Sequence, residues 1–275
     1  MSASEVPTAA PRPLTRGRQV LDACRAEGRA ALVGYLPVGF PSVQGSIEAM
    51  VAMVEAGADI VEVGMPYSDP ILDGPLIQRA TEAALERGCR VSDVFAAVRG
   101  VVEAGAAAYV MIYWNLVLAR GVDRFAAELA EAGGSGLITP DLIPDEAGDW
   151  LAASDAHELD RVFLVAPSST PERVAGVATA SRGFIYAASL MGVTGTRTSV
   201  GSAAEGLVAR TREVTDLPIG VGLGVSTRAQ AAEVAGFADA VIVGSALVRA
   251  LGDGGIPALR EVTAELAAGV REGRR

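Results

Sequence analysis

The feature that most constrains this chain is an alternation, repeated eight times, between short β-branched runs and longer amphipathic segments. Connections this short between strands and helices predict strands that all run parallel. Eight such units in about 240 residues match the count and length of a (β/α)8 barrel. We therefore predict an α/β fold, a single-domain (β/α)8 TIM barrel with an extra N-terminal helix.

The expected barrel spans residues 14–275, after a disordered tail at residues 1–13. Strands are expected at residues 31–36, 60–63, 109–113, 136–138, 161–165, 184–187, 219–221 and 240–243. Helices are expected at residues 17–27, 43–55, 76–86, 123–132, 171–180, 203–215, 228–235, 246–251 and 257–270. An open doubly wound sheet is the alternative, but the Gly-x-Gly-x-x-Gly fingerprint of that fold does not follow the first strand.

Charge and hydropathy exclude several classes of partner. The net charge of −10 and the pI near 4.7 argue against nucleic acid or an anionic membrane surface. No apolar run approaches the roughly 18 residues needed to span a bilayer. Cys24 and Cys89 form no close-spaced pair, so we expect a cytoplasmic location.

The side chains that are missing restrict the chemistry. All 23 basic residues are arginines, so neither a lysine Schiff base nor covalently held pyridoxal phosphate is available. The single histidine, His157, stands in a polar segment typical of a solvated helix end. We expect no metal and no cofactor, with acid–base catalysis left to carboxylates and tyrosines.

Two carboxylates stand out near the second expected strand. Glu62 lies within the apolar run Ile60-Val61-Glu62-Val63, where an ionisable group is costly without a partner or a task. Asp73 follows eleven residues later in a loop stiffened by prolines. A solvated glutamate at a sheet edge is the alternative, but neither face of this strand looks exposed. We expect Glu62 to have a raised pKa and Asp73 to stay ionised.

Further polar side chains and glycines follow the other strands, at the barrel end where active sites form. Tyr113 and Asn115 end the third expected strand, and Tyr186 ends the sixth. Glycine-containing loops follow strands six, seven and eight, and Gly244-Ser245 opens a short helix. Such loops and a helix N-terminus predict a phosphate site made of backbone amides rather than basic side chains. A magnesium site at Asp69 and Asp73 is a weaker alternative.

These motifs resemble the alpha subunit family of tryptophan synthase from about Ala30 to Leu251. The resemblance is carried by Pro66-Tyr67-Ser68-Asp69-Pro70 with Asp73-Gly74-Pro75, by Tyr113-Trp114-Asn115, and by Gly192-Val193-Thr194-Gly195. It implies a lyase that cleaves indole-3-glycerol phosphate to indole and glyceraldehyde 3-phosphate by a retro-aldol reaction, in L-tryptophan biosynthesis.

The resemblance also implies roles for individual residues. Glu62 would protonate the indole ring at C3, and Asp73 would hold the indole N–H. Tyr186 would lie in the active site, and Thr194 would position Asp73. The implied phosphate-binding residues are Gly195, Gly224, Gly244 and Ser245. The implied indole pocket is lined by Tyr35, Ile138, Leu164 and Leu223.

The resemblance further implies a pyridoxal-phosphate-carrying beta subunit as partner, in an alpha2beta2 heterotetramer. The loop after the second strand, which contains Pro66, Asp69, Pro70 and Pro75 and is called loop two below, would form the contact together with the Asn115 region. Three alternatives stay open: a free-standing indole-3-glycerol-phosphate lyase, a non-catalytic barrel that only activates a partner, and another phosphate-binding barrel enzyme such as a sugar-phosphate isomerase. Both carboxylates are present, which counts against the non-catalytic barrel.

Overall fold

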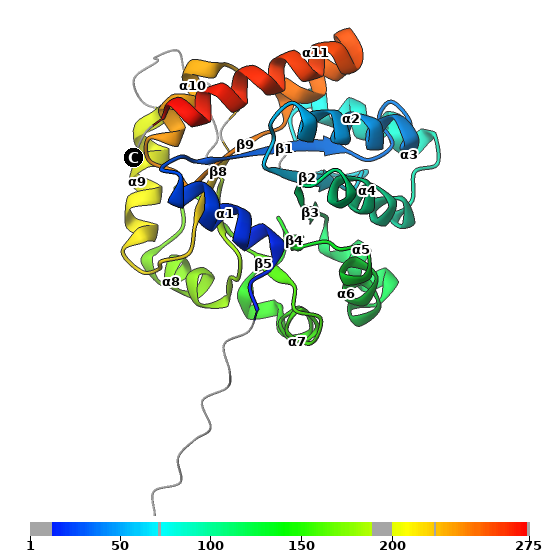
Figure 1. The fold of residues 1–275 in the computed structure, drawn as a ribbon. Coiled ribbons are helices and arrows are strands. Elements are labelled where there is room, and N and C mark those ends of the chain that lie inside the picture. Colours follow the sequence, from blue (N-terminus) through cyan, green and yellow to red (C-terminus); the bar gives the residue numbers. More distant parts are fainter. Residues whose placement is uncertain (1–12, 71–72, 189–199, 223, 274–275) are drawn as a thin grey trace, which may run out of the picture.

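A computed structural model describes residues 13–70, 73–188, 200–222 and 224–273. Within them, helices surround a sheet of parallel strands (Figure 1). The strands are β1 Ala31–Pro37, β2 Ile60–Gly64, β3 Ala107–Met111, β4 Gly136–Ile138, β5 Asp160–Val162, β6 Leu164–Val165, β7 Ile185–Ala188, β8 Ile219–Gly222 and β9 Ala240–Val243. The helices are α1 Arg16–Ala26, α2 Val43–Glu55, α3 Pro75–Glu86, α4 Val91–Glu103, α5 Trp114–Arg120, α6 Val122–Glu131, α7 Gly148–Ala156, α8 Pro171–Ala180, α9 Val200–Arg212, α10 Arg228–Ala235 and α11 Ser245–Glu272, with a 3-10 turn at Pro144–Glu146.

The nine strands fill eight barrel positions. Their order is β5-β4-β3-β2-β1-β9-β8-β7-β6, and only Phe163 separates the two end strands in sequence. The Thr139 amide donates to the Val162 carbonyl, and the Tyr186 amide donates to the Phe163 carbonyl at 3.1 Å. β5 and β6 are therefore two halves of one barrel strand, which closes the sheet. The predicted (β/α)8 barrel is confirmed.

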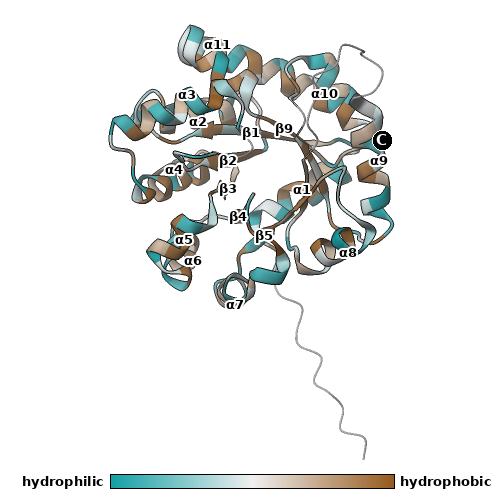
Figure 2. Cartoon of the chain, turned by 180° about the vertical axis from the view of Figure 1, so that it is seen from behind, coloured by the Kyte–Doolittle hydropathy of each residue, from teal (hydrophilic) through white to brown (hydrophobic). Residues whose placement is uncertain are grey.

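Strand side chains alternate between two cores. One set points outward and packs under the surrounding helices. The other fills the barrel interior together with Leu21 and Cys24 of α1. Helix α1, drawn in blue, lies across the amino-terminal end of the strands, as expected for an extra N-terminal helix (Figure 1). In Figure 2 the strands are mostly brown, and teal residues are frequent on the helices around them.

The structure corrects one strand and several helices. The strand predicted at residues 109–113 runs from Ala107 to Met111, because β3 pairs with β2 from Ala107 onward. Tyr113 instead forms the N-cap of α5, and Asn115 lies inside that helix. α4, α5 and α7 were not predicted. The two helices expected near the C-terminus form α11, which is kinked where Gly255 adopts a φ of 66°.

Two further predictions concern the chain as a whole, and the structure bears on them only for the described residues. The expected tail at residues 1–13 lies outside the described residues, apart from Pro13. Among the helices of the described part of the chain, none is long and apolar enough to cross a membrane.

Candidate active site

Glu62 lies in the middle of β2 and is only 1% exposed. Its register partners are Tyr35 on β1 and Tyr109 on β3. Among the described residues, its Oε2 atom has no hydrogen-bond partner. The alternative of a solvated glutamate at a sheet edge is therefore wrong, and the unpaired Oε2 atom of this buried carboxyl group requires an explanation.

Asp73 lies at the end of the loop that follows β2, one residue before the N-cap of α3. The Gln78 side-chain amide donates to the Asp73 backbone carbonyl at 2.9 Å, which anchors the residue to α3. The side chain of Asp73 is half-buried. Burial raises the pKa of Asp73, which opposes the predicted ionised state.

Asp73 influences the titration of Glu62. Burial raises the pKa of Glu62 from 4.5 to about 8, and the nearby Asp73 carboxylate contributes to the rise. Burial also raises the pKa values of Tyr35 and Tyr186, and both carboxyl groups add to that effect. These four side chains therefore lie near enough to influence one another's titration, toward the barrel end where active sites form.

Glycines on neighbouring strands make room for the two tyrosine rings. A Cβ atom at Gly64 would lie 2.4–2.6 Å from the Tyr35 ring and hydroxyl, and one at Gly244 would lie 3.2 Å from the same ring. A Cβ atom at Gly222 would lie 2.5 Å from the Tyr186 hydroxyl. Larger residues at these positions would displace the rings from the barrel mouth.

Ile138 and Leu164 belong to the apolar cluster inside the barrel. Ile138 is fully buried, and Leu164 and Tyr186 are partly buried side chains packed against the same cluster. Two of the four residues predicted to line the indole pocket, Ile138 and Leu164, thus lie in the barrel interior beside Tyr186.

The predicted phosphate-binding residues include Gly224, Gly244 and Ser245, which follow β8 and β9. Gly224 has a φ of 75°, and Gly244 is the N-cap of α11 without a side-chain cap. The Leu247 and Val248 amides donate to the Gly244 carbonyl, and the Ser245 and Ala246 N–H groups ahead of them are positioned for an anion. Gly224 and Ser245 line one cavity of about 630 Å³ together with Ser226 and Arg249.

Three predicted site residues, Thr194, Gly195 and Leu223, lie outside the described residues. Within the described ranges, no group of three or more His, Cys, Asp or Glu side chains is arranged to hold a metal ion. Asp69 is exposed and accepts a hydrogen bond from the neighbouring Ser68 hydroxyl at 2.6 Å. His157 follows α7 and lies 3.0 Å from the Asp123 carboxylate, as expected for a histidine at a helix end.

Two features near Asp73 escaped the sequence analysis. The Tyr67 and Tyr113 rings stack with centroids 4.2 Å apart, and Gln78 supports Asp73 from α3. The motifs contain both tyrosines, but no spacing rule indicates that they meet, because they follow different strands. Gln78 offers no signal, since a glutamine on the first turns of a helix is common.

Comparison with known proteins agrees with this geometry. A family model described as tryptophan synthase alpha chain matches residues 21–272. The tryptophan synthase alpha chain of Mycobacterium avium (strain 104) is 66% identical over 253 residues, covering 92% of this chain and 93% of the relative. That of Mycobacterium marinum is 65% identical over 261 residues, covering 95% of this chain and 97% of the relative.

Solved structures lead to the same family. A chain of M. tuberculosis tryptophan synthase in its ligand-free form matches with a TM-score of 0.88 and 61% identity, covering 94% of this chain and 99% of that chain. The tryptophan synthase subunit alpha of Legionella pneumophila str. Paris matches with a TM-score of 0.85 and 28% identity, again covering 94% and 99%. This chain belongs to the tryptophan synthase alpha chain family.

Proposed function

We infer that this chain is a lyase that cleaves indole-3-glycerol phosphate to indole and glyceraldehyde 3-phosphate in L-tryptophan biosynthesis. The observation that carries this inference is Glu62, a buried carboxyl group whose Oε2 atom has no hydrogen-bond partner among the described residues and whose pKa is raised by burial and by Asp73. Family membership supplies the substrate class.

Glu62 and Asp73 divide the chemistry between them. With a pKa of about 8, Glu62 is protonated at neutral pH and donates its proton to indole C3. The protonated ring is electron-poor. Removal of the proton from the adjacent glycerol hydroxyl then lets that oxygen form the aldehyde, while the electrons of the C–C bond return to the ring. Glu62 is ionised after the first step and accepts the hydroxyl proton, and Asp73 stabilises the positive charge that grows on the indole N–H.

The remaining site residues bind the two ends of the substrate. Tyr35, Ile138, Leu164 and Leu223 contact the indole ring, and Tyr186 closes the pocket beside Glu62. Backbone amides of Gly195, Gly224, Gly244 and Ser245 hold the phosphate, and Thr194 orients Asp73. The sequence contains no lysine for imine chemistry, so we propose proton transfer without a metal or cofactor.

The expected partner is the tryptophan synthase beta subunit, which carries pyridoxal phosphate and uses the indole. We propose that it docks over loop two and α5 in an alpha2beta2 heterotetramer, so that indole passes directly between subunits. Cys24 and Cys89 are both free thiols, which suits a reducing cytoplasm.

Release of indole by the purified chain, alone and with saturating beta subunit, tests this function. We expect slow release by the chain alone and faster release with the partner, because docking on loop two would order Asp73. Equal rates in both conditions would favour the free-standing lyase. No release in either condition would contradict the lyase assignment and favour a non-catalytic barrel.

A further inference from the structure

The loop that carries Asp73 is held at its beginning by β3. The Met65 amide donates to the Met111 carbonyl at 2.9 Å, which extends the pairing of β2 and β3 by one residue. Two residues later, Tyr67 stacks on Tyr113 with ring centroids 4.2 Å apart and an angle of 16° between the ring planes. The start of the loop is therefore fixed by one backbone hydrogen bond and one ring contact.

Tyr113 is a firm support for that ring contact. Its side chain is 7% exposed, and it forms the N-cap of α5. The next residue, Trp114, donates its amide to both Asp141 carboxylate oxygens, at 3.0 and 3.1 Å. Tyr67 is only half-buried. In this pair, Tyr113 belongs to the rigid framework, and Tyr67 belongs to the loop that it holds.

The far end of the loop is fixed separately. Gln78 binds the Asp73 carbonyl, and Pro75 begins α3 with a fixed φ. Asp73 lies six residues after Tyr67 in the sequence, and each of the two residues has its own anchor. Asp73 also lies close enough to Glu62 to affect its titration. A shift of the loop at Tyr67 would change the distance between the two carboxyl groups.

We propose that Tyr67 and Tyr113 are positioning residues for Asp73: their stacked rings hold loop two so that the Asp73 carboxylate faces Glu62 and the substrate. This inference rests on the proposed function. The rings act through the loop and do not transfer protons, so the flat aromatic surface is the feature that positions Asp73.

The test compares leucine and phenylalanine variants of each tyrosine. Tyr67→Leu and Tyr113→Leu remove the stack, whereas Tyr67→Phe and Tyr113→Phe keep it. Phe125→Leu is the matched control, because it disrupts another aromatic pair, Phe95–Phe125, whose centroids are 5.1 Å apart and which lies in the core under the helices. Indole release is measured for each variant with and without the beta subunit, together with inhibition by glycerol 3-phosphate and thermal unfolding.

We expect each leucine variant to lower kcat by about 10-fold, because misplacing a reacting group is costly, and to keep KM and glycerol 3-phosphate inhibition within about twofold. The kcat of the double leucine variant is expected to equal that of the less active single variant, since both changes break the same contact. The high-pH limb of the rate profile moves to lower pH, because Asp73 no longer raises the pKa of Glu62. The kcat values of the phenylalanine variants should stay near that of wild type. Phe125→Leu should lower thermal stability and leave kcat unchanged.

Two results would overturn this inference while leaving the lyase function intact. One is a leucine variant whose kcat and pH profile match those of wild type. The other is a phenylalanine variant that falls as far as its leucine counterpart, since the hydroxyl would then be the important group. Wild-type protein that releases no indole would instead overturn the proposed function, and this inference with it.

Discussion

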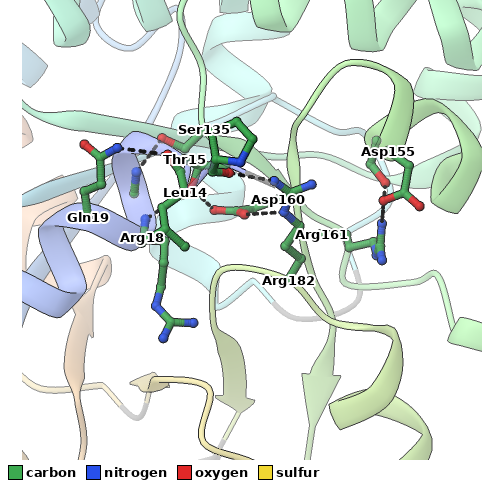
Figure 3. Close-up of polar contacts among 12 residues, drawn as sticks. Leu14, Thr15, Arg18, Gln19, Ser135, Asp155, Asp160, Arg161 and Arg182 are labelled. Atoms are coloured by element: carbon green, nitrogen blue, oxygen red, sulfur yellow. Dashed lines mark hydrogen bonds and ion pairs between the residues drawn. The ribbon is translucent and has the colours of Figure 1, made fainter. Parts of the chain in front are cut away.

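The two ends of the barrel each bury a carboxyl group, and they treat it in opposite ways. Glu62 at the carboxyl-terminal end and Asp160 at the amino-terminal end are both 1% exposed. Asp160 accepts a hydrogen bond from the Thr15 hydroxyl, and Arg182 Nε lies 3.7 Å away (Figure 3). It also accepts a hydrogen bond from the Tyr109 hydroxyl at 2.7 Å. Glu62 Oε2 has no partner among the described residues. Two carboxyl groups that are equally buried therefore differ in their hydrogen bonding.

Tyr109 makes the contrast sharper. It is the register partner of Glu62 on β3, yet its hydroxyl binds Asp160 at the other end. Helix α1 permits this, since a Cβ atom at Gly17 would lie 2.1 Å from that hydroxyl. Burial raises the pKa of both carboxyl groups, but Thr15, Tyr109 and nearby arginines oppose the rise at Asp160. The amino-terminal end uses its carboxylate to hold α1, whereas at the other end Glu62 Oε2 lacks a partner within the described part of the chain.

The strongest test of this contrast replaces Glu62, the proposed proton donor. We expect Glu62→Gln to lower indole release by about 10²–10⁴-fold while leaving the fold intact, because an amide keeps the shape but cannot exchange the proton. Asp73→Asn should do nearly as much. Steady-state kinetics and circular dichroism provide the measurement. Retention of more than about a tenth of wild-type activity in Glu62→Gln would remove Glu62 from its assigned role.

The matching change at the opposite end should act on stability. Asp160→Asn is expected to lower the free energy of unfolding by about 2–4 kcal/mol, because Arg182 loses its counter-charge and two hydroxyl groups lose a charged acceptor. Urea unfolding measures the change, and kcat at a temperature where the variant is folded should stay near wild type. A large loss of kcat in fully folded Asp160→Asn would contradict the division between the two ends.

The pH dependence of stability should reveal the cost of leaving Glu62 unpaired. Its pKa is about 8 when folded against an ordinary 4.5, so the folded chain binds more protons between these values. Stability due to this group is therefore highest below pH 4.5 and falls as pH rises to 8. Glu62→Gln should remove this decline, which at about 1.4 kcal/mol per pKa unit amounts to roughly 4–5 kcal/mol. If the free energies of unfolding of the two proteins changed with pH in the same way from pH 5 to 9, the result would argue against an unpaired, desolvated carboxyl group.

The smallest expected effect concerns the tyrosine between the two sites. Tyr109→Phe should lower the free energy of unfolding by about 1 kcal/mol, since Asp160 keeps Thr15 and Arg182 as partners. Indole release and its pH profile should be unchanged, because the lost hydroxyl belongs to the Asp160 network. A shifted pH profile would indicate that Tyr109 also serves Glu62, and the two ends would then not be independent.

Local sequence predicted the half of the site that follows strand two. Apolar alternation around Glu62 and the prolines near Asp73 are local signals, and both residues lie where the barrel prediction puts them. Tyr186 and Gly244 were found in the same way, from the ends of their strands. The third strand was misplaced by two residues, because Ala107 and Ala108 have weak strand propensity and only pairing with β2 decides that they belong to β3.

By itself, the sequence determined the class of fold, the buried position of Glu62 and the chemistry excluded by the absence of lysine, because hydrophobic period and side-chain type are properties of short segments. Only the tertiary structure decided which buried carboxyl group is paired. Thr15, Tyr109 and Arg182 are brought to Asp160 by α1, β3 and the turn before β7, and Tyr113 is brought to Tyr67 from another strand end. Hydrogen bonds and ring contacts depend on distance in space, and closure of the barrel sets those distances.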